Sequence, residues 1–326
     1  MLTVHAVDHE DEVARRLWAE QWAELGQRYG GLSSPSDIPP DGLISSLVGW
    51  VGDTPVGTVA VRFAAPDGIA PVAEIKRLYV APDWRGRGFS KVLMGAAEKA
   101  SRRAGATRII LETGTEQPEA VALYTAIGYD AIPSYGSHRD DPRSLAFAKD
   151  LPSRILVISG TIGAGKTEIG GAVSDLLAER GVRHGFIDGD YLAQAEPPLE
   201  GDPHNQALMF AALAAIAPAY RERGYGSIVF PRVVEDEADR GRYARAFVGP
   251  GGVAQVSIIR LAASEETRLA RVAAREPEGK WRAWGSARTV ELEVILAASL
   301  VEDAIVQNDG RDRLDVAAEV LDAAGW

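Results

Sequence analysis

The sequence predicts two α/β domains in one chain, because an apolar strand, a glycine-rich loop and an amphipathic helix follow one another twice. The first glycine-rich loop is Arg85–Ser90 and the second is Gly160–Thr167. A length of 326 residues suits two domains that each bury a core of their own. Between them, Pro152 follows a last apolar run and precedes the next strand. We therefore expect domains at residues 1–151 and 152–326.

The composition is that of an ordinary globular protein, with 46% hydrophobic and 25% charged residues. No stretch approaches the roughly 20 apolar residues of a membrane span, and the acidic start at Met1–Glu12 is unlike a signal peptide. We expect a cytoplasmic protein with no membrane partner. The absence of cysteine excludes disulfides, thiolate zinc sites and a cysteinyl acyl-enzyme. The net charge of −11, with an acidic excess in both halves, argues against a nucleic-acid partner.

The first half alternates predicted helices and strands, as its apolar spacing and turn residues indicate. In order, we expect a helix at 10–28, a Gly/Ser/Pro-rich loop at 30–42, strands at 43–51 and 56–63 joined by a hairpin turn, a strand at 73–80, the first glycine loop, a helix ending at Gly105, and a last strand ending near Leu151.

The second half begins with the strand 155–159 and a loop that fits G-x-x-x-x-G-K-[ST], which consists of Gly160, Thr161, Ile162, Gly163, Ala164, Gly165, Lys166 and Thr167. An amphipathic helix beginning at Glu168 follows. Glycines leave the backbone N–H groups of such a loop open to phosphate oxygens, which the helix N-terminus also attracts. Lys166 would reach the β- and γ-phosphates of ATP or another nucleoside triphosphate, and Thr167 would bind Mg²⁺. A glycine-rich turn with an incidental lysine is the alternative.

Further strands are expected at 183–190, 227–232 and 253–261. The first of these ends in two acids, Asp188 and Asp190. Carboxylates at the carboxyl edge of a parallel strand lie beside the phosphate loop in α/β folds, so the two acids are candidates for holding Mg²⁺ or accepting a substrate proton. An ordinary Asp-Gly surface turn is the alternative.

The first glycine loop resembles the pyrophosphate loop R-x-x-G-x-[GA] of the GNAT acetyltransferases, and residues 111–129 resemble the closing motif of that superfamily. This resemblance implies a mixed sheet, acetyl-CoA as the acetyl donor and amine acetylation. Ser90 stands where the pattern has Gly or Ala, and its side chain is small enough for the loop to close. The implied coenzyme-binding residues are Leu78, Tyr79 and Val80 on the strand, and Arg85, Gly86, Arg87, Gly88, Phe89 and Ser90 in the loop.

The same resemblance implies two catalytic side chains. Tyr124 stands where the family's tyrosine protonates the leaving thiolate, a task that suits a phenol with a pKa near 10. Glu74 is the candidate base for the acceptor ammonium. The alternatives are a packing role for Tyr124 and an ion pair between Glu74 and Lys76 or Arg77.

The second half is similar to small-molecule P-loop kinases such as adenylylsulfate kinase and, more loosely, chloramphenicol phosphotransferase and gluconate kinase. This resemblance implies a parallel sheet covered by helices on both faces. Candidate residues for transition-state charge are Arg271 and Arg275, favoured over Arg268, although a solvated basic face fits the same spacing. Arg232 and Trp281 are further candidates for the substrate site. Residues 304–311 resemble the closing strand and adenine-side loop of those kinases, which makes Asn308 and Gly310 candidates for the adenine base.

Together these features predict a bifunctional transferase that acetylates the amine and phosphorylates the hydroxyl of a small metabolite or antibiotic. Two alternatives stay open. The second domain could sense a nucleotide and regulate acetylation, or the acetyl acceptor could be a protein or peptide amine.

Overall fold

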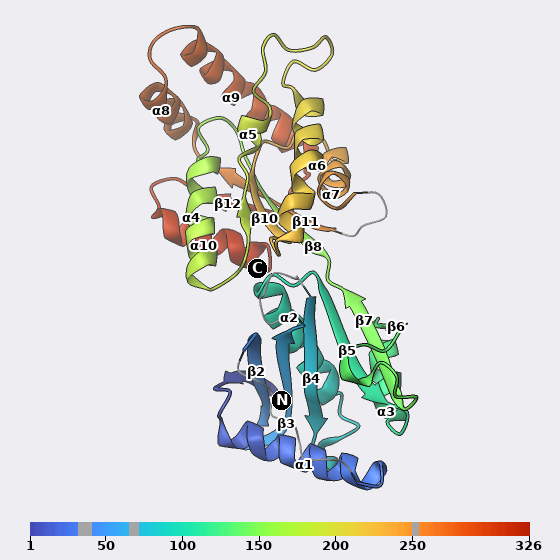
Figure 1. The fold of residues 1–326 in the computed structure, drawn as a ribbon. Helices are drawn as coiled ribbons and strands as arrows, with labels where there is room; N and C mark the ends of the chain where they lie inside the picture. The colour runs from blue at the N-terminus through green and yellow to red at the C-terminus, as the bar shows by residue number, and fades with distance from the viewer. Residues whose placement is uncertain (32–40, 65–71, 250–253) are drawn as a thin grey trace. The chain divides into compact units, whose positions relative to one another are not determined.

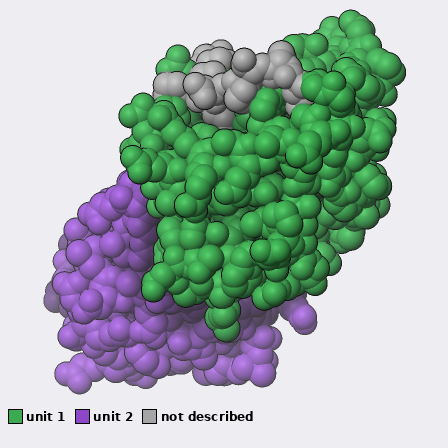
Figure 2. All heavy atoms as spheres, turned by 90° about the horizontal axis from the view of Figure 1, so that it is seen from below, with its two compact units in different colours: residues 1–151 green, residues 152–326 purple. Residues whose placement is uncertain are grey.

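The computed structural model describes residues 1–31, 41–64, 72–249 and 254–326. The chain forms two compact units, Met1–Leu151 and Pro152–Trp326, which Figure 2 distinguishes by colour. Most of the loop expected at 30–42 lies outside the described residues. Within the described ranges, no helix is both long and apolar enough to cross a bilayer.

Unit 1 is built on a seven-stranded sheet in the order β1-β2-β3-β4-β5-β7-β6, in which β4 and β5 form the parallel pair and the other pairs are antiparallel. This is the predicted mixed sheet (Figure 1). Its elements are β1 (Thr3–Val7), α1 (Glu12–Arg28), β2 (Leu43–Val51), β3 (Thr54–Phe63), β4 (Val72–Val80), η1 (Pro82–Trp84), α2 (Phe89–Arg103), β5 (Arg108–Gly114), α3 (Pro118–Ala126), β6 (Asp130–Ile132), η2 (Gly136–His138) and β7 (Ser144–Asp150).

Strands β4 and β5 separate part of the way along their length. Their pairing runs from Val72↔Arg108 to Ile75↔Leu111, yet β4 continues to Val80 and β5 to Gly114. On its other edge, β4 carries an irregularity against β3, where Arg77 takes a left-handed φ of 58°. A β-bulge of this kind increases the local twist and redirects the strand. A gap therefore opens between β4 and β5 beyond Ile75.

The two faces of this sheet have different partners. Helix α2 covers one face, where Val61, Ile75 and Leu111 contribute to a buried cluster with Leu93. Helix α1 covers the other face, where Leu17 packs in a smaller cluster with other buried apolar side chains. Because side chains alternate along a strand, Glu74, Lys76 and Glu112 share the α1 face.

Unit 2 contains a five-stranded parallel sheet in the order β12-β11-β8-β10-β9. Helices α4 and α10 pack together over one face, and α6 and α7 pack over the other (Figure 1). Its elements are β8 (Ser153–Ser159), α4 (Lys166–Glu179), β9 (Gly185–Phe186), α5 (Gly189–Leu192), α6 (Gln206–Glu222), β10 (Ser227–Pro231), α7 (Ala238–Val248), β11 (Ala254–Ala262), α8 (Glu265–Arg275), α9 (Lys280–Ser299), β12 (Ala304–Gln307) and α10 (Arg313–Ala323).

The direction of the connections changes between two neighbouring strands of this sheet. The chain leaves β8 toward α4 on one face and leaves β10 toward α7 on the other. In open parallel sheets, such a switch leaves a crevice beyond the carboxyl ends of the strands, and ligands bind there. The loop 160–167 follows β8 directly, and Arg232 follows β10.

Candidate active sites

The loop before α2 has the backbone of an anion cradle. Gly86 and Gly88 adopt left-handed φ values of 75° and 78°, which glycine tolerates without strain. Gly88 is also the N-cap of α2. Within the described ranges, the N–H groups of residues 86–90 donate to no protein acceptor. Open donors at a helix N-terminus favour phosphate oxygens, so this loop fits a pyrophosphate.

The arginine side chains of this loop brace it. Arg85 donates to both carboxylate oxygens of Glu24 on α1, at 3.1 and 2.5 Å, and its Nε donates to the carbonyl of Val80 at 2.8 Å. The hydrogen bond from Arg85 is the main cause of the lowered pKa of Glu24. Arg87 lies over the ring of Trp84, 4.8 Å from its centroid. The guanidinium of Arg85 is therefore engaged within the protein, which leaves its backbone to face a ligand.

The part of β4 predicted to pair with the coenzyme lies beyond the bulge. Tyr79 and Val80 pair with β3. The carbonyl of Leu78 accepts a hydrogen bond from Nε2 of Gln21 at 2.8 Å, and that of Val80 is already engaged by Arg85. A pantetheine chain in the gap would therefore replace a side-chain donor at Leu78.

Glu74 lies in a polar cluster on the α1 face of the sheet. It is 8% exposed, and its Oε1 accepts a hydrogen bond from the hydroxyl of Tyr135 at 2.9 Å. The ammonium of Lys76 lies 2.7 Å from the same oxygen and 3.7 Å from Oε2 of Glu112. The ion pair with Lys76 that the sequence left open is thus present beside the candidate base.

Tyr124 lies on the opposite face, in the core beneath α2. Its ring packs 5.8 Å from that of Phe147 and 6.1 Å from that of Tyr129, between centroids. Burial raises the pKa of Tyr124 well above the ordinary value of a tyrosine. The assumption of a pKa near 10 was therefore wrong, because it ignored desolvation of the phenolate. A phenol of this kind stays protonated and donates a hydrogen bond more readily than a proton.

The loop of unit 2 needs its glycines. Gly160, Gly163 and Gly165 have φ values of 140°, 79° and 97°. A Cβ on Gly160 would lie 2.7 Å from the carbonyl oxygen of Leu261, and one on Gly163 would lie 2.5 Å from that of Arg268. Among the described residues, no protein acceptor takes the N–H groups of residues 162, 163 and 165–168. The loop thus presents open backbone donors at a helix N-terminus, an arrangement that fits an anion.

Helix α4 begins at Lys166, two residues earlier than expected, so Lys166 and Thr167 lie in its first turn. The Nζ of Lys166 donates to the carbonyl of Thr161 at 3.0 Å, and burial lowers the pKa of this lysine. The hydroxyl of Thr167 donates to Oδ2 of Asp188 at 3.0 Å. This hydroxyl–carboxylate pair fits Mg²⁺, which takes few protein ligands and keeps waters and phosphate oxygens. No described group of three or more His, Cys, Asp or Glu side chains is arranged as a metal site.

The two predicted acids have different surroundings. Asp188 is also the N-cap of α5, because its Oδ1 accepts from the N–H of Asp190 at 2.9 Å. Asp190 pairs with Arg232 at 2.5 Å, and Arg232, which is 7% exposed, also donates to the carbonyl of His204 at 3.2 Å. Of the two acids, only Asp188 contacts the hydroxyl of Thr167.

The predicted arginines of α8 are spread over different environments. Arg271 donates to the carbonyls of Gly163, Ala164 and Asn308 at 3.2, 3.3 and 2.9 Å, so it holds the loop in shape. Arg268 is buried and pairs with Glu293. Arg275 is exposed and contacts Glu276.

The predicted adenine-side and substrate residues also have other contacts. The amide of Asn308 donates to the carbonyl of Ala164 at 2.8 Å, which places it on the loop. Gly310 takes a left-handed φ of 61° in the turn after β12. Trp281 is 62% exposed and packs edge-on against Trp284.

Residues 9–129 match the model of the Acetyltransferase (GNAT) family. The "IAA acetyltransferase" of Azospirillum brasilense is 33% identical over 108 residues, covering 33% of this chain and 69% of that protein. An uncharacterized N-acetyltransferase of Escherichia coli (strain K12) is 36% identical over 72 residues, 20% of this chain and 43% of that protein. The solved structure of a GNAT-family acetyltransferase from Staphylococcus aureus Mu50 covers 46% of this chain and 99% of its own at 13% identity, with a TM-score of 0.39.

The residues that the family model matches include the motif at 85–90. The likeness implied by the sequence is thereby confirmed for the first unit. Through the domain that contains residues 9–129, the chain belongs to the GNAT acetyltransferase family.

Proposed function

We propose that the protein is a transferase with two activities. Unit 1 would move the acetyl group of acetyl-CoA to the amino group of a small molecule, and unit 2 would move a phosphoryl group from ATP to a hydroxyl. The observation that supports this most is the pair of glycine loops at helix N-termini, whose N–H groups at 86–90 and 162–168 include donors with no acceptor among the described residues. Pyrophosphate and triphosphate are the anions that such loops bind.

For acetyl transfer, the reacting groups would meet where β4 and β5 stop pairing beyond Ile75. Glu74 lies on one face and Tyr124 on the other. Glu74 takes a proton from the acceptor ammonium, and the amine nitrogen then bonds to the acetyl carbon as the carbon–sulfur bond breaks. The second amine proton leaves with the thiol, and the phenol of Tyr124 hydrogen-bonds the sulfur. Backbone N–H groups beside the bulge polarise the carbonyl.

For phosphoryl transfer, the loop 160–167 would hold the phosphates, with Lys166 beside the transferred group. Thr167 and Asp188 would hold Mg²⁺, which neutralises phosphate charge when bound. Arg271 keeps the loop in its binding shape through three carbonyls. Arg232 and Asp190 lie beyond the neighbouring strand, where the acceptor hydroxyl would approach.

The test uses the full chain with labelled acetyl-CoA and labelled ATP on a panel of aminohydroxy compounds. We expect one compound to take both labels. Glu74→Gln should remove only acetyl transfer, and Lys166→Ala only phosphoryl transfer. Labelling of different compounds by the two donors would contradict a shared substrate, and absence of any phosphorylated product would contradict the kinase activity.

A nucleotide-sensing role for unit 2 is the second candidate. It is favoured by the ion pair between Asp190 and Arg232, since this carboxylate is already engaged by an arginine at 2.5 Å instead of facing a substrate hydroxyl. In that case ATP would change the acetylation rate without being consumed, and Lys166→Ala would abolish this modulation.

A further inference from the structure

The polar cluster of Glu74, Lys76, Glu112 and Tyr135 lies where the reacting groups would meet. Pairing between β4 and β5 ends at Ile75↔Leu111. Lys76 and Glu112 are the first residues beyond that pair, at the apex of the gap, and their side chains are on the α1 face together with Glu74. Tyr135, from the loop after β6, closes the cluster with its hydroxyl on Glu74.

The cluster carries an excess of negative charge. It contains two carboxylates and one ammonium, and burial together with the charges of Glu74 and Glu112 raises the pKa of Tyr135, which keeps this phenol neutral. Arg62 is the cross-strand neighbour of Glu74, but its Nε donates to the carbonyl of Phe63 at 3.3 Å. A buried negative charge is costly unless a cation pairs with it.

The two carboxylates are not equivalent. Glu74 receives both the Tyr135 hydroxyl and the Lys76 ammonium on Oε1. Glu112 has Lys76 at 3.7 Å from Oε2, while its Oε1 is buried and has no hydrogen-bond partner among the described residues. Burial removes the hydrogen bonds that a carboxylate oxygen makes to water, and this costs free energy unless another donor replaces them. A ligand that donates to Oε1 of Glu112 would replace them.

We infer that Glu112 is a specificity-determining residue that binds the ammonium of the acetyl acceptor, so that the acceptor is an aliphatic primary amine that enters as a cation. This rests on the proposed acetyl transfer. The ammonium donates to Oε1 of Glu112 and gives one proton to Glu74, which leaves a neutral amine at the apex of the gap. Aryl amines, which are uncharged at neutral pH, and amines with an adjacent carboxylate do not match this site.

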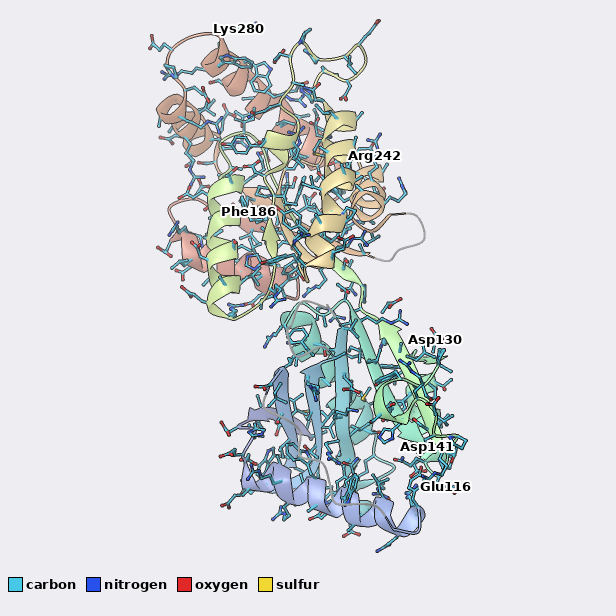
Figure 3. The ribbon with its side chains drawn as sticks, in the orientation of Figure 1. Glu116, Asp130, Asp141, Phe186, Arg242 and Lys280 are labelled. Atoms are coloured by element: carbon cyan, nitrogen blue, oxygen red, sulfur yellow. The ribbon has the colours of Figure 1, made fainter. Side chains whose placement is uncertain are left out.

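The experiment compares Glu112→Gln with a matched control, Glu116→Gln, in the full chain. Gln keeps the shape of the side chain and removes its charge, and Glu116 is exposed on the loop after β5 (Figure 3). Acetyl-CoA binding is measured first by calorimetry. Acetyl transfer is then followed by thiol release with 1,5-diaminopentane, glycine and aniline as acceptors.

Among these three, we expect 1,5-diaminopentane to be the preferred acceptor. Its KM should rise about 10- to 100-fold in Glu112→Gln, as expected for loss of a charged hydrogen bond, with unchanged coenzyme affinity. Glu116→Gln should match the unaltered protein, and Glu112→Asp should recover part of the affinity. A preference for aniline or glycine, or an unchanged KM in Glu112→Gln, would overturn the inference. Failure to bind acetyl-CoA would instead refute the proposed acetyl transfer.

Discussion

At the scale of single residues, Tyr135 positions the candidate base. Its hydroxyl donates to Oε1 of Glu74 at 2.9 Å, so the phenol fixes the position of the carboxylate. In Tyr135→Phe we expect kcat for acetyl transfer to fall about 10-fold, the effect of losing roughly 1.4 kcal/mol. The affinity for acetyl-CoA should stay unchanged, because the phenol contacts the candidate base and not the coenzyme loop.

The matched control is Tyr191→Phe, since Tyr191 is 72% exposed in unit 2. An unchanged kcat in Tyr135→Phe, or an equal loss in Tyr191→Phe, would contradict a positioning role.

We expect the charge of Lys166 to destabilise the nucleotide-free protein and to favour nucleotide binding. Burial lowers its pKa, which means that the folded protein without nucleotide disfavours the charged ammonium. Lys166→Met removes that charge and keeps the length of the chain. We expect Met to raise the melting temperature of the nucleotide-free unit by roughly 2–4 °C, the shift that about 1 kcal/mol produces in a domain of this size. Stabilisation by ATP and Mg²⁺ should disappear in the same variant.

Differential scanning calorimetry with and without ATP measures both effects. A lower melting temperature without nucleotide would show that the ammonium stabilises the loop through Thr161 rather than costing stability.

The roles of single residues could be predicted where the residues belong to a motif that is continuous in the sequence. Lys166 and Thr167 follow from a continuous pattern, and Glu74 from its place before the first loop. Tyr135 and Glu112 were missed because their relation to Glu74 depends on strand register and on a loop 61 residues away. Arg271 was predicted to stabilise transition-state charge, but in the structure it donates to carbonyls of the loop. The spacing of arginines along a helix does not predict which acceptors they contact.

At the scale of elements, the loop 160–167 depends on close backbone approach. A Cβ on Gly163 would lie 2.5 Å from the carbonyl oxygen of Arg268, a backbone atom that moves only with α8. Gly163→Ala should therefore displace the loop and reduce ATP affinity by about 100-fold or more, since a displaced loop loses several hydrogen bonds to phosphate. Binding of coenzyme A should be unchanged.

Gly171→Ala is the control on the neighbouring helix α4, where a Cβ would meet nothing within 4 Å. It should leave ATP affinity unchanged and stabilise the helix by up to about 1 kcal/mol. Equal ATP affinities in the two variants, measured by calorimetric titration, would contradict the account of the loop.

Most of the strands and helices that the sequence predicted lie within a few positions of the observed ones, whereas β5, α6 and α7 had no predicted counterpart. Strand β1, Thr3–Val7, was missed because its short polar and apolar mixture shows no clear alternation. The separation of β4 from β5 was also out of reach. It depends on pairing with a strand that is distant in sequence and on the left-handed backbone conformation of Arg77. The residue type does not predict that conformation.

At the scale of the whole molecule, buried tyrosines set the response to alkali. Burial raises the pKa of four tyrosines in unit 1, namely Tyr79, Tyr124, Tyr129 and Tyr135. It also raises the pKa of Tyr243 in unit 2. A raised folded-state pKa means that the unfolded chain releases its proton first, so stability is fully present below pH about 10 and falls as the pH rises further.

We expect unit 1 to unfold at a lower alkaline pH than unit 2, because more of its tyrosines must ionise on unfolding. Calorimetry across an alkaline pH series, with tyrosinate absorbance as the second probe, separates the two transitions. The transition of unit 2 is the one that Lys166→Met shifts. Unfolding of unit 2 at a lower alkaline pH than unit 1 would contradict this expectation.

Each unit has its own sheet, core and glycine loop, so the central claim is that one chain holds two separate anion sites. The most direct test is calorimetric titration of ATP and Mg²⁺ into the full chain already saturated with acetyl-CoA. Our account predicts one ATP bound per chain, with an affinity that is lost in Lys166→Ala while acetyl-CoA stays bound. Absence of ATP binding, or displacement of acetyl-CoA by ATP, would contradict it.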